Sequence, residues 1–256
     1  MKNKSEYIKF ILPLLIIFFW FIFTYTGKVP PTSLPSLSAV KDTFIEMLKS
    51  GQLSNDLSLS LRRVLAGFFI SSVLGISLGI FMGISSKAKE FFQLTLTAIR
   101  QIPMIAWIPL IILWAGIGEV SKIVVILFAA TFPIVVNTMG GVDSTSETYL
   151  EVAKMYGLSK KDTFFKVYLP SALPNIFTGL RLGLGASWMA VVASELIASS
   201  SGIGYRLNDA RSLMRSDVVI VCMIIIGLVG LFPQPLFPTI VINSPFFISK
   251  FTSFKI

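Results

Sequence analysis

Long stretches without a single charged residue dominate this chain and limit what it can fold into. They cover residues 10–27, 64–86, 101–118 and 123–142. Each approaches the roughly 20 apolar residues that a helix needs to cross the hydrocarbon core of a bilayer. Two further apolar stretches begin near residues 173 and 218, the first interrupted only by Arg181 and Glu195. The sequence therefore predicts an all-α, multi-pass membrane protein with about six transmembrane helices.

Composition agrees with a protein surrounded by membrane lipid. Hydrophobic residues make up 54% of the chain, charged residues 14%, and the mean hydropathy is +0.79. No small-x-small cleavage site follows the first apolar stretch near Thr24, so we expect a retained anchor rather than a cleaved signal peptide. The net charge of +9 comes from basic residues dispersed through the polar loops, which argues against nucleic-acid binding.

Several kinds of chemistry lack the residues they need. The chain contains no histidine, which removes the usual general base near neutral pH and the commonest metal ligand. It also lacks a Gly-x-x-x-x-Gly-Lys-Ser/Thr run, the loop that holds phosphates in NTPases. We therefore expect no cofactor or metal on this chain, and we expect any ATP hydrolysis to belong to another chain.

A polar segment, residues 140–172, interrupts the apolar stretches. Ser144 lies three residues before Glu147, a spacing at which side chains can satisfy the free backbone N–H groups of a helix start. Ser159 and Asp162 repeat that spacing. The segment is therefore predicted to form two short helices.

Gly157 lies between these two helices, where glycine enters the left-handed conformation of a helix end without steric cost. The second helix is predicted to stop before Leu169, because a residue that precedes proline, here Pro170, disfavours the helical conformation. One turn before the corner, Ala153 offers a small side chain and Glu151 an acceptor to an approaching protein surface. A protein-docking site is the predicted use.

These residues resemble the cytoplasmic coupling motif of permease subunits in ATP-binding-cassette (ABC) importers. The resemblance rests on Glu151-Val152-Ala153, Gly157 and Val167-Tyr168-Leu169-Pro170. The family usually has alanine where Val152 stands. The resemblance implies that cytosolic ATPase subunits dock on Glu151, Ala153, Gly157, Leu169 and Pro170.

Other segments look like the nitrate, taurine and alkanesulfonate branch of that family. They are Gln101-Ile102-Pro103, Trp107-Ile108-Pro109, Gly116-Ile117-Gly118-Glu119 and Ser201-Gly202-Ile203-Gly204-Tyr205. The branch implies a small oxyanion as cargo, an extracytoplasmic substrate-binding protein as partner, and a permease homodimer that forms the pathway. It also implies the plasma or inner membrane of a bacterium as the location.

Six residues are candidates for lining the pathway. They are Arg100, Gln101, Pro103, Pro109, Arg181 and Glu195. The prolines remove backbone donors and bend the helix, and such breaks often line cavities. A guanidinium at Arg100 can pair with oxyanion oxygens, although a place at the membrane boundary is the equally weighted alternative. For Glu195, pairing with a neighbouring loop is the alternative to a role at the external mouth.

Small residues recur every four positions in two of the predicted spans. They are Gly67, Ser71, Gly75, Gly79 and Gly83 in the second span, and Gly179, Gly183 and Ser187 in the fifth. Such stripes let helix backbones approach closely in membranes. We therefore expect these two spans to pack against each other.

The predicted organisation has four parts. Residues 1–30 form an N-terminal anchor span, and residues 31–58 an external segment with an amphipathic helix at about 38–49. Residues 59–230 form the permease core, which contains the coupling segment. Residues 231–256 are rich in proline and phenylalanine where the family usually has a basic helical tail, which suggests a truncated or frame-shifted ending.

Two other function classes remain open at this point. An ion-coupled secondary transporter or channel would share the apolar spans but would not need the docking segment. A membrane enzyme acting on a lipid-linked substrate would need clustered acids, bases or metal ligands, and only Asp143, Glu147 and Glu151 lie together on the predicted cytosolic side.

Overall fold

The computed structural model describes residues 4–27 and 29–231 of the 256-residue chain. Within these residues every regular element is helical, so the all-α prediction is confirmed. The elements are α1 (Lys4–Tyr25), α2 (Leu37–Lys49), α3 (Gln52–Ile84), α4 (Ser86–Gln101), α5 (Met104–Ala115), α6 (Glu119–Asp143), α7 (Glu147–Met155), α8 (Lys160–Thr163), η1 (Phe164–Tyr168), α9 (Leu169–Ala198), α10 (Ile203–Ser212) and α11 (Ser216–Leu231). The atypical C-terminal segment, residues 231–256, lies outside the described residues apart from Leu231.

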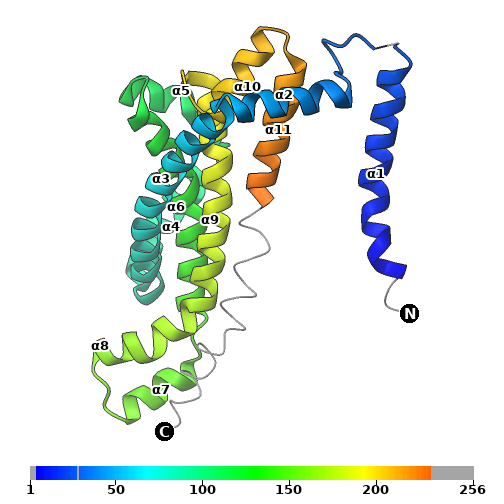
Figure 1. Cartoon of the computed structure of the whole chain (residues 1–256). Helices are drawn as coiled ribbons and strands as arrows, with labels where there is room; N and C mark the ends of the chain where they lie inside the picture. Colours follow the sequence, from blue (N-terminus) through cyan, green and yellow to red (C-terminus); the bar gives the residue numbers. More distant parts are fainter. Residues whose placement is uncertain (1–3, 28, 232–256) are drawn as a thin grey trace.

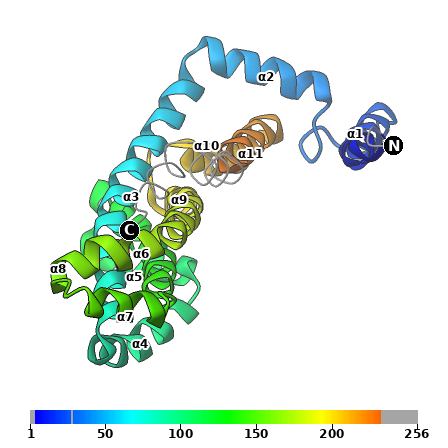
Figure 2. The same ribbon diagram turned by 90° about the horizontal axis from the view of Figure 1, so that it is seen from below.

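Helix α6 forms the centre of the bundle, with α3 on one side and α9 on another (Figures 1 and 2). Its buried face includes Val125, Ile126, Ala130 and Ile134, none of which has any exposed surface. Because lipid is as apolar as these side chains, the close approach of the helices stabilises the bundle mainly through van der Waals contact. The stability of the core therefore depends on how closely the three backbones approach.

Helices α3 and α9 contact each other, as predicted, but the glycines of both small-residue stripes lie closest to α6. A Cβ atom added to Gly67, Gly75 or Gly79 of α3 would lie 2.6–2.7 Å from a side chain of α6. On α9, a Cβ atom at Gly183 would lie 2.9 Å from Ile134 of α6. Both stripes let α6 approach closely. The sequence alone did not indicate that α6 would be the helix that packs against them.

Among the residues that the structure describes, three helical stretches are long and apolar enough to cross a membrane: α3, α6 and the continuous helix that runs through α8, η1 and α9. The pair α4 and α5 passes the same test together but is bent by 100°. Residues 10–25 and helix α11 are shorter apolar helices. The prediction of six spans therefore corresponds to six apolar segments, although the number that cross the bilayer stays a prediction.

The third predicted span, residues 101–118, is not one straight helix. The chain breaks after Gln101, and Pro103 occupies the position before the first turn of α5. Since proline has no N–H and fixes its own backbone angle, it is well suited to that start position. Pro109 lies inside α5. Pro103 therefore stands at the break where α4 ends and α5 begins at a steep angle, whereas Pro109 does not interrupt α5, and the polar helix α4 belongs to the same broken element.

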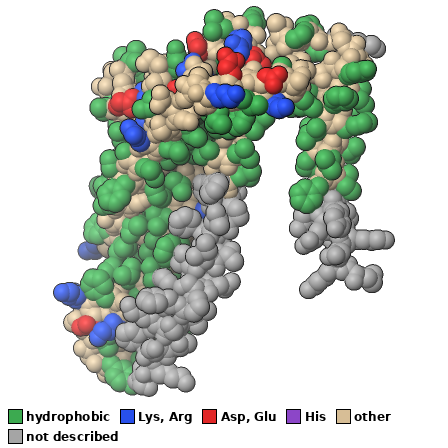
Figure 3. All heavy atoms as spheres, in the orientation of Figure 1, with side chains coloured by type: hydrophobic (Ala, Val, Ile, Leu, Met, Phe, Trp, Pro, Cys, Tyr) green, Lys and Arg blue, Asp and Glu red, His purple; other side chains and the backbone are tan. Residues whose placement is uncertain are grey.

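The amphipathic helix expected at 38–49 is present as α2, which begins at an N-cap where Ser36 accepts from the backbone N–H of Ala39. Its buried residues, Val40, Thr43 and Met47, follow helical spacing and pack toward α11. Charged side chains gather over this end of the molecule, whereas the bundle below is covered by hydrophobic side chains (Figure 3). Helix α1 stands apart from the bundle (Figure 2).

Candidate coupling hairpin and translocation pathway

Helices α7 and α8 form the two arms of a hairpin. Together with the residues that connect it to α6 and α9, it covers residues 144–170 and is here called the coupling hairpin. At its corner Leu158 N donates to Ala153 O, and Gly157 N donates to Lys154 O, each over 3.0 Å. These two bonds and the left-handed angle of Gly157, φ +65°, make a Schellman ending of the helix. The tight corner that the sequence predicts at Gly157 is therefore present.

The start of the second short helix also follows the prediction. Ser159 Oγ accepts from Asp162 N over 3.1 Å and donates to the Asp162 carboxylate over 2.6 Å. The first predicted cap is wrong, because Ser144 belongs to the end of α6 and donates to Gly141 O. Ser146 occupies the start position of α7 without a side-chain cap bond.

The predicted stop at Leu169 is also wrong. Leu169 has helical angles, φ −62° and ψ −47°, and the helix continues through Pro170 into α9. Over η1 the backbone hydrogen bonds span five residues instead of four, so that Leu169 N donates to Phe164 O. We attribute the continuity to this wider turn, which carries the chain into α9 although Pro170 lacks an N–H donor. The second arm of the coupling hairpin is therefore one rod with the long spanning helix α9.

Two large apolar side chains are exposed at the tip of the coupling hairpin, near the exposed lysines Lys154, Lys160 and Lys161. Met155 and Tyr156 are 86% and 67% exposed, and they immediately precede Gly157. Glu151 is exposed, whereas Ala153 is buried, with 4% of its surface exposed. The coupling hairpin projects beyond the bundle at the end opposite α2 and α10 (Figure 1). A separate protein could thus reach Glu151 and the tip, while Ala153 shapes the fold behind them.

At the opposite end of the bundle, a network of charged groups joins α3, α6, α9 and α10. Its centre is Arg63, which donates to Glu195 over 2.7 Å and to both carboxylate oxygens of Glu119 over 2.6 and 2.7 Å. Glu195 is 1% exposed and also accepts from Ser60 Oγ and from the backbone N–H of Gly204. The structure thus places Glu195 against the start of α10 and against Gly202 in the loop that follows α9, the alternative considered for it.

The same loop is held by a second ion pair. Arg206 donates to Asp56 over 2.8 Å, and Asp56 also accepts from the backbone N–H of Gly202. Gly202 has φ +105°, and a Cβ atom there would collide with the Glu195 carboxylate. Both reasons require glycine at this position. Asp56, Arg63 and Glu119 were not predicted as site residues, although Arg63 and Glu119 border the uncharged stretches.

Neither of the two predicted pathway arginines, Arg100 and Arg181, has an ion-pair partner among the described residues. Within the described residues Arg100 makes no hydrogen bond or ion pair, and the buried Nε atom of Arg181 has no hydrogen-bond partner. By contrast, each carboxylate of α3, α6 and α9 forms an ion pair. Gln101 is the exposed last residue of α4, beside Arg100 and before Pro103 at the bend, while Pro109 lies on the exposed side of α5.

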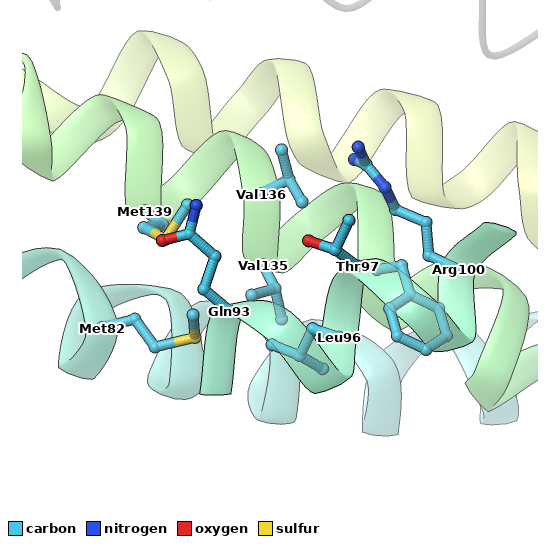
Figure 4. Close-up of a pocket in the computed structure, with 9 residues that line it drawn as sticks. Met82, Gln93, Leu96, Thr97, Arg100, Val135, Val136 and Met139 are labelled. Atoms are coloured by element: carbon cyan, nitrogen blue, oxygen red, sulfur yellow. The ribbon is translucent and has the colours of Figure 1, made fainter. Parts of the chain in front are cut away.

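Arg100 also lines a cavity between α3, α4 and α6, with a volume of about 230 Å³ (Figure 4). Arg181 and Glu195, the other charged candidates, are not among the lining residues. Within the described residues no group of three or more metal-binding side chains occurs. The structure therefore brings one candidate to a cavity and places Glu195 in the network of ion pairs.

Comparison with known proteins identifies the class. Residues 71–242 match the family described as binding-protein-dependent transport system inner membrane component. The taurine transport system permease protein TauC of Escherichia coli is 32% identical over 224 residues, covering 86% of this chain and 81% of that protein. The nitrate import permease protein NrtB of Synechocystis is 39% identical over 172 residues, covering 67% and 62%.

Solved structures share the fold. A chain of an amino acid ABC transporter has a TM-score of 0.62 with 16% identity, covering 76% of this chain and 95% of that one. A chain of the inward-facing MetNI methionine ABC transporter has a TM-score of 0.54 with 18% identity, covering 70% and 94%. The helical bundle, its projecting hairpin and these matches lead to one conclusion: the chain belongs to the permease subunits of binding-protein-dependent ABC transporters, which are not enzymes and work with a separate ATPase subunit.

Proposed function

We propose that two copies of this chain form the pathway of an importer for a small oxyanion, such as an aliphatic sulfonate, taurine or nitrate. In this proposal an extracytoplasmic substrate-binding protein delivers the cargo at the end that carries α2 and α10. Cytosolic ATPase subunits dock on the coupling hairpin, and the protein resides in the plasma or inner membrane of a bacterium. The taurine and nitrate permeases among its relatives support this class of cargo.

The observation that carries the proposal is the shape of the coupling hairpin. The apolar side chains of Met155 and Tyr156 are exposed at its tip in this single chain, and large exposed apolar groups often mark protein contacts. Its second arm continues without a stop through η1 into α9, which packs along α6. A movement of the tip is therefore transmitted to α9, which packs against the central helix α6.

The cargo assignment is supported by the charges inside the bundle. An arginine in a membrane helix is costly unless it is paired or reaches water. The carboxylates of α3, α6 and α9 form ion pairs with other basic side chains, and among the described residues none is paired with Arg100 or Arg181. A cationic cargo would find no free carboxylate on α3, α6 or α9.

The docking test compares two glycines that share the left-handed conformation, in which any other residue would be strained. Gly157 has φ +65° and Gly51 has φ +73°, and an added Cβ atom meets nothing within 4 Å at either site. We expect Gly157→Asp to abolish co-purification of the ATPase and ATP-dependent uptake, because it places a charge at the tip. Gly51→Asp carries similar backbone strain at the other end and is expected to keep co-purification of the ATPase. Normal co-purification with Gly157→Asp would contradict the proposal.

A further inference from the structure

The cavity beside α4 has one polar wall and one apolar wall. Gln93, Thr97 and Arg100 follow one another at intervals of four and three residues, so they lie on one face of the helix. Figure 4 shows their polar ends extending from α4 to the same side. The facing residues of α6 include Phe132, Val136 and Met139. Among the lining residues, the one charge is the guanidinium of Arg100.

The polar wall is open to a ligand. Gln93, Thr97 and Arg100 are exposed, and within the described residues none of them forms a hydrogen bond with the protein. Arg63 in the same bundle is buried and bound to two carboxylates and to Ser201. Arg63 therefore serves the fold, whereas the five N–H donors of the Arg100 guanidinium can reach a molecule in the cavity.

We infer that this cavity binds an organic sulfonate whose tail is apolar, with Arg100 and Thr97 holding the head group. The inference rests on the proposed function and assigns a site within the pathway. The planar fork of a guanidinium donates to two oxygens of an anionic head at once. The hydroxyl of Thr97, one turn away, is placed to donate to the third oxygen.

The apolar wall selects the tail. Phe132 and Val136 provide contact for a short alkyl chain, and the volume of about 230 Å³ limits how large that chain can be. The ammonium group of taurine would face the same apolar wall, and none of the described residues that line the cavity has a carboxylate to pair with it. Nitrate would use the fork of Arg100 but leave the apolar wall without a partner. The cavity therefore favours an alkanesulfonate over both.

The test uses the purified permease–ATPase complex without any binding protein, and 1-butanesulfonate as the probe. Equilibrium binding measured by calorimetry is expected to weaken about tenfold or more in Arg100→Gln, because a charge-assisted pair is lost. Thr97→Val is expected to weaken binding by a smaller factor. Arg62→Gln is the matched control, since Arg62 is exposed on α3 and does not line the cavity. Unchanged affinity in Arg100→Gln would overturn the assignment.

Selectivity and assembly separate this inference from the proposed function. Taurine and nitrate are expected to bind the wild-type complex at least several-fold more weakly than 1-butanesulfonate, and equal affinity for taurine would refute the role of the apolar wall. Arg100→Gln should still co-purify with the ATPase. If the complete importer, with its binding protein, takes up oxyanions while Arg100→Gln binds the probe normally, this site is wrong and the proposed function stands. If it imports no oxyanion at all, the proposed function fails first.

Discussion

The close contact of α3 with α6 can be tested at Gly79. A Cβ atom added there would lie 2.6 Å from Thr138 Cβ and 2.9 Å from the carbonyl oxygen of Val135, whereas ordinary contact begins at 3.4 Å. The oxygen belongs to the backbone of the central helix, so it cannot turn away as a flexible side chain would. In Gly79→Ala the two helices must therefore separate by several tenths of an ångström.

Overpacking of this kind typically costs about 1–3 kcal/mol. Alanine also favours a helix over glycine by about 1 kcal/mol, and this gain would mask part of the loss. Gly140→Ala provides the correction, because Gly140 lies in α6 and an added Cβ atom meets nothing within 4 Å. The difference between the two variants isolates the contact, and we expect Gly79→Ala to be less stable than Gly140→Ala by about 1–3 kcal/mol.

The assay is thermal unfolding of the detergent-purified protein, followed by tryptophan fluorescence. For a chain of this size each kcal/mol corresponds to about 2–4 °C in Tm. The double variant Gly79→Ala with Thr138→Gly removes the nearest clash and is expected to recover part of the loss. If Gly79→Ala and Gly140→Ala melt at the same temperature, the reasoning about the close approach of α3 to α6 is refuted.

Other contacts give further predictions, each measured in the same melting assay. Arg63→Met leaves the buried Glu195 without its cation and is expected to destabilise the fold by about 3–5 kcal/mol, whereas Arg62→Met should change little. Trp188→Phe removes the hydrogen bond from Nε1 to Ile226 O and should cost about 1 kcal/mol. Ser159→Ala removes a helix cap in the coupling hairpin and should cost about 0.5–2 kcal/mol. Equal melting of Arg63→Met and Arg62→Met would contradict the role assigned to the network.

Much of the fold was readable in the sequence because lipid imposes strict rules. Backbone groups in a bilayer must bond within their own segment, so uncharged stretches of sufficient length indicate helices. The same locality explains why the corner at Gly157 and the cap at Ser159 were predicted correctly. Each depends on a few neighbouring residues whose conformational preferences do not change with the rest of the fold.

Predictions failed where a local preference met a longer-range arrangement. The residue before Pro170 disfavours a helix by itself, yet the wider turn of η1 carries the helix into α9. The stripes on α3 and α9 indicated close packing but not the partner, because a small residue shows only that some backbone approaches it. In the structure that backbone is α6 for both stripes.

The charged residues show most clearly what sequence and tertiary structure each decide. The sequence by itself determined that Arg100, Arg181 and Glu195 lie within or beside apolar stretches, where each needs a partner or water. Only the folded chain decided that Arg63 and Glu195 satisfy each other and that Arg100 lies at a cavity without a protein partner among the described residues. The physical reason is that ion pairs form between helices far apart in the chain, so their pairing depends on packing rather than on spacing along the sequence.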